Sequence, residues 1–116
     1  MKENILLEKS FAFAVRVANA AKYLVEERKE FTLSKFFLTS GASVGAFAEE
    51  AVGGESRNDF YSKISLAYKE ARRTKFWIRL LNATGYFDNA QAKSLLDDNE
   101  ELLKIIGKIQ VTTRNQ

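Results

Sequence analysis

The sequence contains no cysteine, no histidine and no proline, and the first two absences exclude most kinds of enzyme site. Without cysteine there is no disulfide and no thiolate ligand for a metal. Without histidine the chain lacks the commonest general base, so Ser–His nucleophile pairs and the Glu-x-x-His motif of di-metal bundles are excluded. We therefore expect a protein that is not an enzyme and that binds neither a metal nor a cofactor.

The lack of proline, together with only six glycines in 116 residues, leaves little that would interrupt a helix. No apolar run approaches the roughly 20 residues that a membrane-spanning helix needs. The first residues, MKENILLEKS, lack the charged and then apolar pattern of a secretory signal. These features, with the missing cysteines, predict a single domain over residues 1–116, located in the cytoplasm and without a membrane partner.

Apolar residues recur at three- and four-residue steps over four segments, and no linker divides them. Helices are expected at about 7–29, 34–52, 57–84 and 89–112. Short connections favour antiparallel neighbours, so the predicted fold is all-α, an antiparallel up-down-up-down four-helix bundle. The fourth helix should direct six apolar residues inward: Leu95, Leu96, Leu102, Leu103, Ile106 and Ile109.

The first predicted helix carries two apolar stripes. One stripe contains Phe11 and Val15, and the second contains Phe13, Val17 and Leu24. A bundle helix that faces one core needs only one stripe, so two stripes indicate either a helix sandwiched between others or a helix that also contacts another chain. We assign Phe13, Val17 and Leu24 to the interface of a homo-oligomer.

The middle of the second predicted helix, SGASVGAFA at 40–48, is rich in small residues. Gly41 and Gly45 lie four residues apart and therefore on one face. Each glycine costs up to about 1 kcal/mol of helix propensity, so close packing against another helix is the expected compensation. The alternative, a phosphate-binding loop, lacks the lysine and hydroxyl residue that should follow the glycines.

Ser56 with Asp59 three residues later predicts the start of the third helix. Its core stripe is expected to comprise Phe60, Ile64, Ala67, Ala71, Thr74, Ile78 and Leu81. Large apolar groups away from a core mark protein interfaces more often than ligand pockets. The predicted oligomer interface therefore also includes four residues outside this stripe: Leu66, Phe76, Trp77 and Leu80.

Positive charge is concentrated on the third predicted helix. Residues 56–84 hold seven lysines and arginines and two acids, a net charge of +5, whereas the whole chain carries only +3. Aromatic rings beside cations can stack on bases while the cations contact phosphates. The basic flank, a predicted nucleic-acid-binding site, comprises Tyr61, Tyr68, Arg72, Lys75 and Arg79 in one row, widened by Lys69 and Arg73.

Two other interpretations of the basic flank remain open. Its cations could pair with acids of the same or a neighbouring chain, and the segment 97–101, reading DDNEE, offers four carboxylates. The flank could also be a solvated helix face, as most charge runs on helices are.

The segment 40–81, SGASVGAFAEEAVGGESRNDFYSKISLAYKEARRTKFWIRLL, resembles the four-helix-bundle proteins named after reading frames in 23S rRNA intervening sequences. The matching residues are Ser43, Gly45, Ala46, Glu50, Ala51, Glu55, Ser56, Asp59, Phe60, Ser65, Ala67, Glu70, Ala71, Trp77, Leu80 and Leu81. The first and fourth helices fit the family in length and pattern. Phe47 departs from it, because relatives often carry asparagine there, and Glu49 replaces a small or apolar residue.

The resemblance implies a homo-oligomeric ring, commonly a pentamer. One branch of the family is similar to accessory proteins of diversity-generating retroelements, which engage a reverse transcriptase and nucleic acid. The family name records where some of its genes lie and does not establish a ribosomal function.

The combined expectation is a non-enzymatic oligomeric binding protein that contacts RNA or DNA through the basic flank. The alternative is a protein-interaction scaffold or adaptor whose basic flank meets an acidic partner such as a polymerase or reverse transcriptase. A third hypothesis is a structural oligomer that uses the basic flank in its own assembly.

Overall fold

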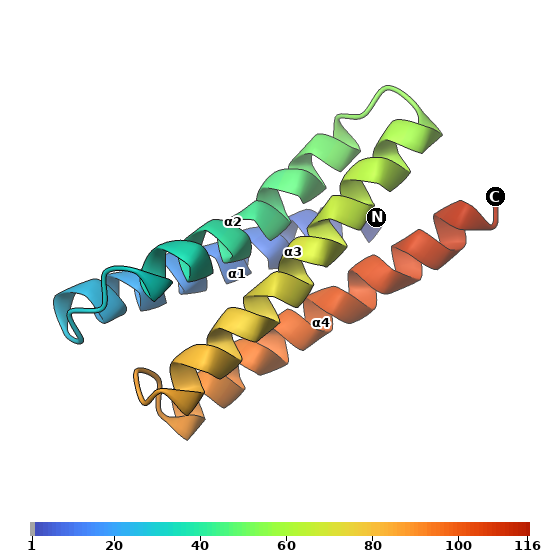
Figure 1. Ribbon diagram of the computed structural model, residues 1–116. Coiled ribbons are helices and arrows are strands. Elements are labelled where there is room, and N and C mark those ends of the chain that lie inside the picture. The colour runs from blue at the N-terminus through green and yellow to red at the C-terminus, as the bar shows by residue number, and fades with distance from the viewer. Residues whose placement is uncertain (1) are drawn as a thin grey trace.

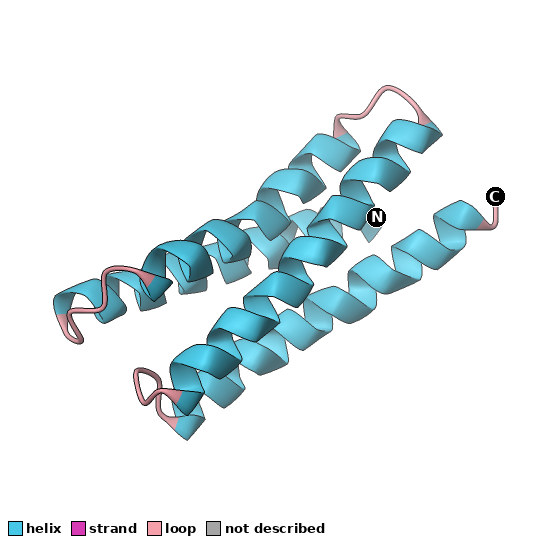
Figure 2. Cartoon of the chain, viewed as in Figure 1, coloured by secondary structure: helices cyan, strands magenta, loops and turns pink. Residues whose placement is uncertain are grey.

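The structure, a computed structural model, describes the backbone of residues 2–116 and the side chains of residues 5–116. Within that part of the chain it contains four helices and no strand (Figures 1 and 2). The helices are α1 (Lys2–Glu26), α2 (Leu33–Val52), α3 (Arg57–Ala83) and α4 (Asn89–Arg114). The all-α prediction is confirmed. The largest shift is at α1, which begins and ends earlier than the predicted 7–29.

Each short connection turns the chain back alongside the preceding helix, which produces an antiparallel bundle (Figure 1). α2 packs between α1 and α3, while α4 packs against α3 and, less extensively, against α1. The bundle measures 46 × 20 × 19 Å. No helix among residues 2–116 is both long and apolar enough to cross a membrane.

Side chains cap the starts of α3 and α4 by accepting hydrogen bonds from backbone N–H groups that have no partner inside the helix. Ser56 Oγ accepts from the backbone N–H of Asp59 at 3.0 Å, as the sequence predicts. At the start of α4, Asp88 and Gln91 form a reciprocal capping box. These caps fix where the two helices begin.

The start of α2 is capped in a way that the sequence did not reveal. Thr32 occupies the cap position, but its side chain accepts no capping hydrogen bond. Instead the buried carboxylate of Glu30 accepts from the backbone N–H of Ser34 at 2.7 Å and of Thr32 at 3.1 Å. An acid just before the helix therefore satisfies N–H groups that a side chain at the cap position would ordinarily satisfy.

The core contains the second apolar stripe of α1, which corrects its assignment to an oligomer interface. Phe13, Val17 and Leu24 are exposed by 2%, 0% and 0%, so none of the three is available to another chain. The stripe that contains Phe11 and Val15 faces solvent instead. The stripe that was expected to contact another chain is therefore the one that builds the core.

The core faces of α3 and α4 agree with the sequence pattern. On α3, six of the seven predicted residues are buried and Phe60 is half-buried; on α4, five of six are buried and Leu96 is half-buried. The cause is the three- and four-residue spacing of these apolar residues, which places them on one face of each helix.

Glycines on α2 explain which stripe of α1 turns inward. A Cβ atom at Gly41 would lie 2.7 Å from both methyl carbons of Val17, and one at Gly45 would lie 3.3 Å from the backbone oxygen of Ser10. α1 and α2 therefore approach more closely than any side chain at Gly41 would allow. The predicted packing role of Gly41 and Gly45 is confirmed. Phe47, one of the two departures from the family pattern, is partly buried against the core.

Two hydrogen bonds cross between helices inside the core. Thr74 Oγ1 on α3 donates to Ser40 Oγ on α2 at 3.0 Å, and Asn99 Nδ2 on α4 donates to the backbone oxygen of Ala71 at 2.9 Å. Buried polar groups are costly without partners, so these bonds favour one relative height of α2, α3 and α4 over shifted alternatives.

Replacing Gly41 with alanine should lower the free energy of unfolding by about 1–3 kcal/mol, because the added methyl group overlaps Val17. Alanine is the better helix former by about 1 kcal/mol, so a decrease would show that packing outweighs propensity. Chemical denaturation measures the change.

The matched control for Gly41→Ala is Gly107→Ala on α4, where the added carbon would meet Tyr68 Cε1 at an ordinary 3.6 Å. That variant should be more stable by up to about 1 kcal/mol. The double variant Val17→Ala with Gly41→Ala should be destabilised by less than the sum of the two single effects. Equal stabilisation by alanine at Gly41 and Gly107 would contradict the close approach of α1 and α2.

Candidate nucleic-acid interface

The net positive charge of the protein belongs to one half of the bundle. α3 and α4 together carry eleven lysines and arginines and six acids, a net charge of +5. α1 and α2 together carry equal numbers of both signs, and the remaining residues contribute −2. The bundle therefore has a basic side formed by α3 and α4, and the pairing of individual side chains decides how much of that charge is available.

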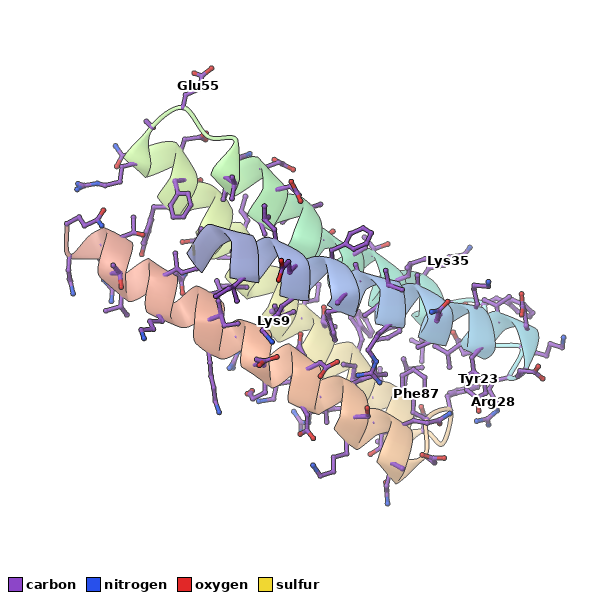
Figure 3. All side chains as sticks on the ribbon, turned by 180° about the vertical axis from the view of Figure 1, so that it is seen from behind. Lys9, Tyr23, Arg28, Lys35, Glu55 and Phe87 are labelled. Carbon is purple, nitrogen blue, oxygen red and sulfur yellow. The ribbon has the colours of Figure 1, made fainter. Side chains whose placement is uncertain are left out.

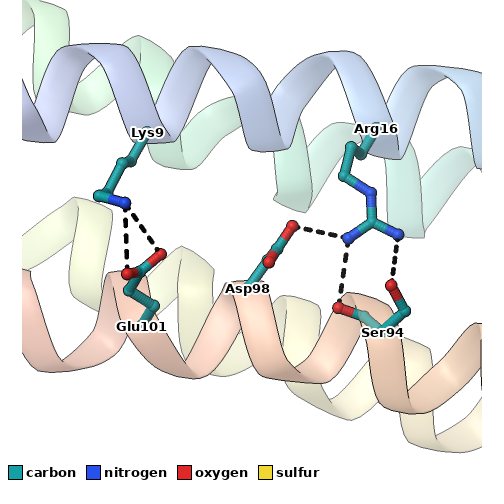
Figure 4. Close-up of polar contacts among 5 residues, drawn as sticks. All are labelled: Lys9, Arg16, Ser94, Asp98 and Glu101. Carbon is teal, nitrogen blue, oxygen red and sulfur yellow. Dashed lines mark hydrogen bonds and ion pairs between the residues drawn. The ribbon is translucent and has the colours of Figure 1, made fainter.

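Cations of α1 engage two acids of α4 across the seam between these helices (Figure 4). Arg16 donates to the carboxylate of Asp98 at 2.6 Å and to the side chain and backbone oxygens of Ser94 at 2.8 and 3.2 Å. Lys9, which extends from α1 toward α4 in Figure 3, lies 3.3 Å from the carboxylate of Glu101. These contacts hold α1 and α4 together where their apolar packing is sparse.

The other two acids of the segment 97–101 are also engaged within the chain. Glu100 lies 3.6 Å from the amine of Lys75 on α3, and Asp97 lies 2.8 Å from the amine of Lys93 one turn earlier on α4. All four carboxylates of this segment thus face a cation of their own chain. In this single chain they neutralise only Lys75 of the predicted basic flank.

The rest of the basic flank is largely unneutralised. Arg73 has a loose contact with Glu70 at 3.6 Å. Among the side chains that the structure describes, Lys69, Arg72 and Arg79 have no carboxylate within 4.0 Å and are exposed. Their charges therefore point into solvent with no compensating acid beside them.

α4 adds three cations that the sequence analysis did not include: Lys104, Lys108 and Arg114. Contacts between the helices keep a constant antiparallel register, in which Tyr68 lies opposite Gly107 and Gln110 donates to Ser65 at 3.3 Å. In that register Lys104 is level with the turn that carries Arg72. The three cations are exposed and, among the described side chains, have no carboxylate within 4.0 Å.

We name these six residues the basic face: Lys69, Arg72 and Arg79 of α3 with Lys104, Lys108 and Arg114 of α4. The α4 members escaped the sequence analysis because the fourth helix also carries Lys93 and the acidic segment 97–101, and its charges nearly cancel. The sequence did carry one indication of them: apart from Lys93, every cation of this helix follows the acidic segment.

The tyrosines of the predicted flank lie in the seam between α3 and α4. Tyr68 is half-buried with its ring edge over Gly107. Tyr61 is half-buried and lines an open groove of about 250 Å³ that is also lined by Arg57, Asn58, Thr113 and Arg114. Tyr68 packs against the core and Tyr61 is half-buried at the edge of the groove, so both rings offer less free surface than the sequence pattern suggested.

A different group of aromatic rings is exposed beside the basic face. Phe36 of α2 stacks on Trp77 of α3 with ring centroids 5.2 Å apart, and Phe76 meets Trp77 edge to face with centroids 5.1 Å apart. Phe36 is 53% exposed and Phe76 is 54% exposed. We name Phe36, Trp77 and Phe76 the aromatic row.

Of the predicted interface residues on α3, Phe76 is exposed, whereas Leu66, Trp77 and Leu80 are half-buried.

A second apolar surface lies on the opposite pair of helices. Phe11 of α1 is 69% exposed, and Val15 and Val25 of the same helix are also exposed. Beside them an open groove of about 230 Å³ runs between α1 and α2 and is lined by Ala18, Val25 and Leu38, among others. We name Phe11, Val15, Val25 and Leu38 the outer stripe. Its residues are apolar and exposed, as an interface formed by Phe13, Val17 and Leu24 would have required.

Comparison with known proteins identifies a family. Residues 2–108 match the family described as 23S rRNA-intervening sequence protein. The chain is also similar to a solved structure, a protein of unknown function from the S23 ribosomal protein family of Bacteroides thetaiotaomicron. The two are 44% identical, with a TM-score of 0.93, over 95% of this chain and 98% of that one. No curated protein matches the chain.

Removing charge from the basic face should not weaken the fold. Replacing Arg72 and Arg79 with glutamine should leave the free energy of unfolding within about 0.5 kcal/mol of the original value or raise it, because both side chains stand among like charges. Replacing Lys75 with glutamine should instead lower it, by up to about 1 kcal/mol, because the ion pair with Glu100 can no longer form. A larger decrease at Arg72 or Arg79, measured by urea denaturation, would mean that these arginines serve the fold.

Proposed function

The chain belongs to the 23S rRNA-intervening sequence protein family, and we propose that it is a non-enzymatic, oligomeric protein that binds RNA or DNA through its basic face. The observation that carries the proposal is the arrangement of charge: the acids nearest the basic face are already engaged within the chain, while its six cations are not. Such a surface is available to contact an external anion.

Phosphate backbones fit this surface well. The six cations extend along two adjacent, rigid helices, so that an extended polyanion can contact several of them together. Each phosphate contact releases a condensed counterion, which favours binding at low salt and carries no sequence information. Affinity should therefore be sequence-tolerant and strongly dependent on salt concentration.

Assembly would multiply these contacts. The outer stripe presents exposed apolar side chains from α1 and α2, on a different side of the bundle from the basic face. We assign the subunit contact of a homo-oligomer to this stripe; the family resemblance favours a pentameric ring. Weak phosphate contacts repeated once per subunit then combine, because binding through one subunit raises the local concentration of the ligand at the next.

A second candidate function is an adaptor for an acidic protein such as a polymerase. The aromatic row favours it, because aromatic residues and arginine together are enriched in protein interfaces. A partner that is recovered with the protein and is retained after nuclease treatment would support the adaptor.

Binding to a mixed-sequence RNA should weaken steeply with salt and should weaken further when Arg72 and Arg79 are both replaced by glutamate. The slope of log K against log salt should become shallower by about 0.7–0.9 for each phosphate that the variant no longer binds. Fluorescence anisotropy at several salt concentrations measures both effects. The single variants Arg72→Glu and Arg79→Glu are also measured, and Lys29→Glu is their control, because it makes the same charge change in the loop after α1. Binding that ignores salt, or equal weakening in control and test variants, would contradict the proposal.

Replacing Phe11 and Val15 with serine should convert the oligomer into a folded monomer of 13.2 kDa, because both side chains are exposed in the single chain and contribute little to its core. Light-scattering chromatography reports the mass, and circular dichroism the helix content. The matched control is Ile5→Ser, which removes an exposed apolar residue from another side of α1 and should leave the mass unchanged. Variants of unchanged mass would exclude the outer stripe as the subunit contact.

A further inference from the structure

The aromatic row borders the basic face at Phe76. On a helix the surface neighbours of a residue are those three and four positions away. For Phe76 these are Arg72, Arg73, Arg79 and Leu80, so three of its four neighbours are arginines. A phenyl ring that is 54% exposed thus stands among cations, where a solvated charged face would carry a polar residue.

The rings behind Phe76 hold it in place. Trp77 is half-buried and contacts both Phe76 and Phe36, with centroid separations of 5.1 and 5.2 Å. Phe76 and Trp77 meet at an interplanar angle of 76°, so their contact is edge to face. The aromatic row is therefore a preformed array whose last ring remains exposed in the midst of the arginines.

We infer that Phe76 is a stacking platform for an unpaired base of a single-stranded nucleic acid, whose phosphates on either side of that base are held by Arg72 and Arg79. This inference rests on the proposed function and specifies its ligand. Charge complementarity identifies the occupant: an apolar partner alone would leave the flanking arginines unneutralised, whereas a nucleotide brings a flat ring and an anionic backbone together.

The spacing agrees with this ligand. Arg72 and Arg79 are seven residues apart, about 10 Å along the helix axis, with Phe76 between them. Single-stranded ligands are commonly bound by this combination of a cationic track and aromatic rings, and stacking tolerates any base because every base has a π face. Phe76, rather than Tyr61 or Tyr68, is then the aromatic residue of the site, since those two rings are half-buried beside α4 whereas Phe76 is exposed among the arginines.

The test separates base stacking from phosphate contact. A labelled strand of about ten thymidines, within the usual site size for such surfaces, is compared with an abasic strand of the same length and charge. The intact protein should bind the thymidine strand at least about fivefold more tightly, the gain expected for one stacked base. Phe76→Ala should remove that preference without changing affinity for the abasic strand, and Phe76→Tyr should retain it because the π face remains.

A second signal comes from Trp77, the one tryptophan of the sequence, which touches Phe76. Its fluorescence should change when the thymidine strand binds and should change less with the abasic strand at equal saturation. Because Phe76 is largely exposed, Phe76→Ala should fold normally, which circular dichroism verifies.

Each remaining outcome has a distinct meaning. Equal binding of both strands by the intact protein would overturn base stacking and leave the proposed phosphate binding standing. Binding of neither strand would overturn both proposals. If Phe76→Ala lowers the oligomer mass in light scattering, the aromatic row is a subunit contact and the inference about a stacked base is wrong.

Discussion

The close approach of α1 to α2 is the constraint from which the rest of the arrangement follows. Gly41 has no side chain, and Val17 occupies the space where one would lie. This contact turns the stripe of Phe13, Val17 and Leu24 into the core and therefore turns Phe11 and Val15 outward. The apolar stripe of α1 that stays exposed is therefore a consequence of where α2 has a glycine in place of a side chain.

Electrostatic pairing divides the bundle in a second way. The acids of α4 lie between cations of α1 and cations of α3. Asp98 and Glu101 engage α1, and Glu100 engages α3. Those contacts tie α4 to both neighbours. They also leave the cations farther along α4 and around Arg72 without acids, which makes the basic face a by-product of how the fold satisfies its carboxylates.

The surfaces proposed for assembly and for ligand binding are different. The outer stripe belongs to α1 and α2, the basic face to α3 and α4, and the aromatic row runs from α2 to the edge of the basic face. A ring built through the outer stripe would leave the basic face of each subunit accessible. The aromatic row lies between the two proposed surfaces, so a substitution at its last ring, Phe76, can distinguish a subunit contact from a ligand contact.

Local patterns alone determined the four helices, the caps of α3 and α4 and the core stripes of those helices, because the spacing of apolar residues and the residues before each helix act over a few positions. The family resemblance likewise came from the quoted residues of the middle helices.

The sequence could not decide which stripe of α1 faces inward, because both have helical spacing; the van der Waals contact of Val17 with Gly41 decides that. Nor could it show that Lys104, Lys108 and Arg114 extend the basic flank or that Tyr61 and Tyr68 lie in a seam. Residues far apart in sequence become neighbours only through the antiparallel packing of α3 and α4, and that packing also determines which charges are neutralised.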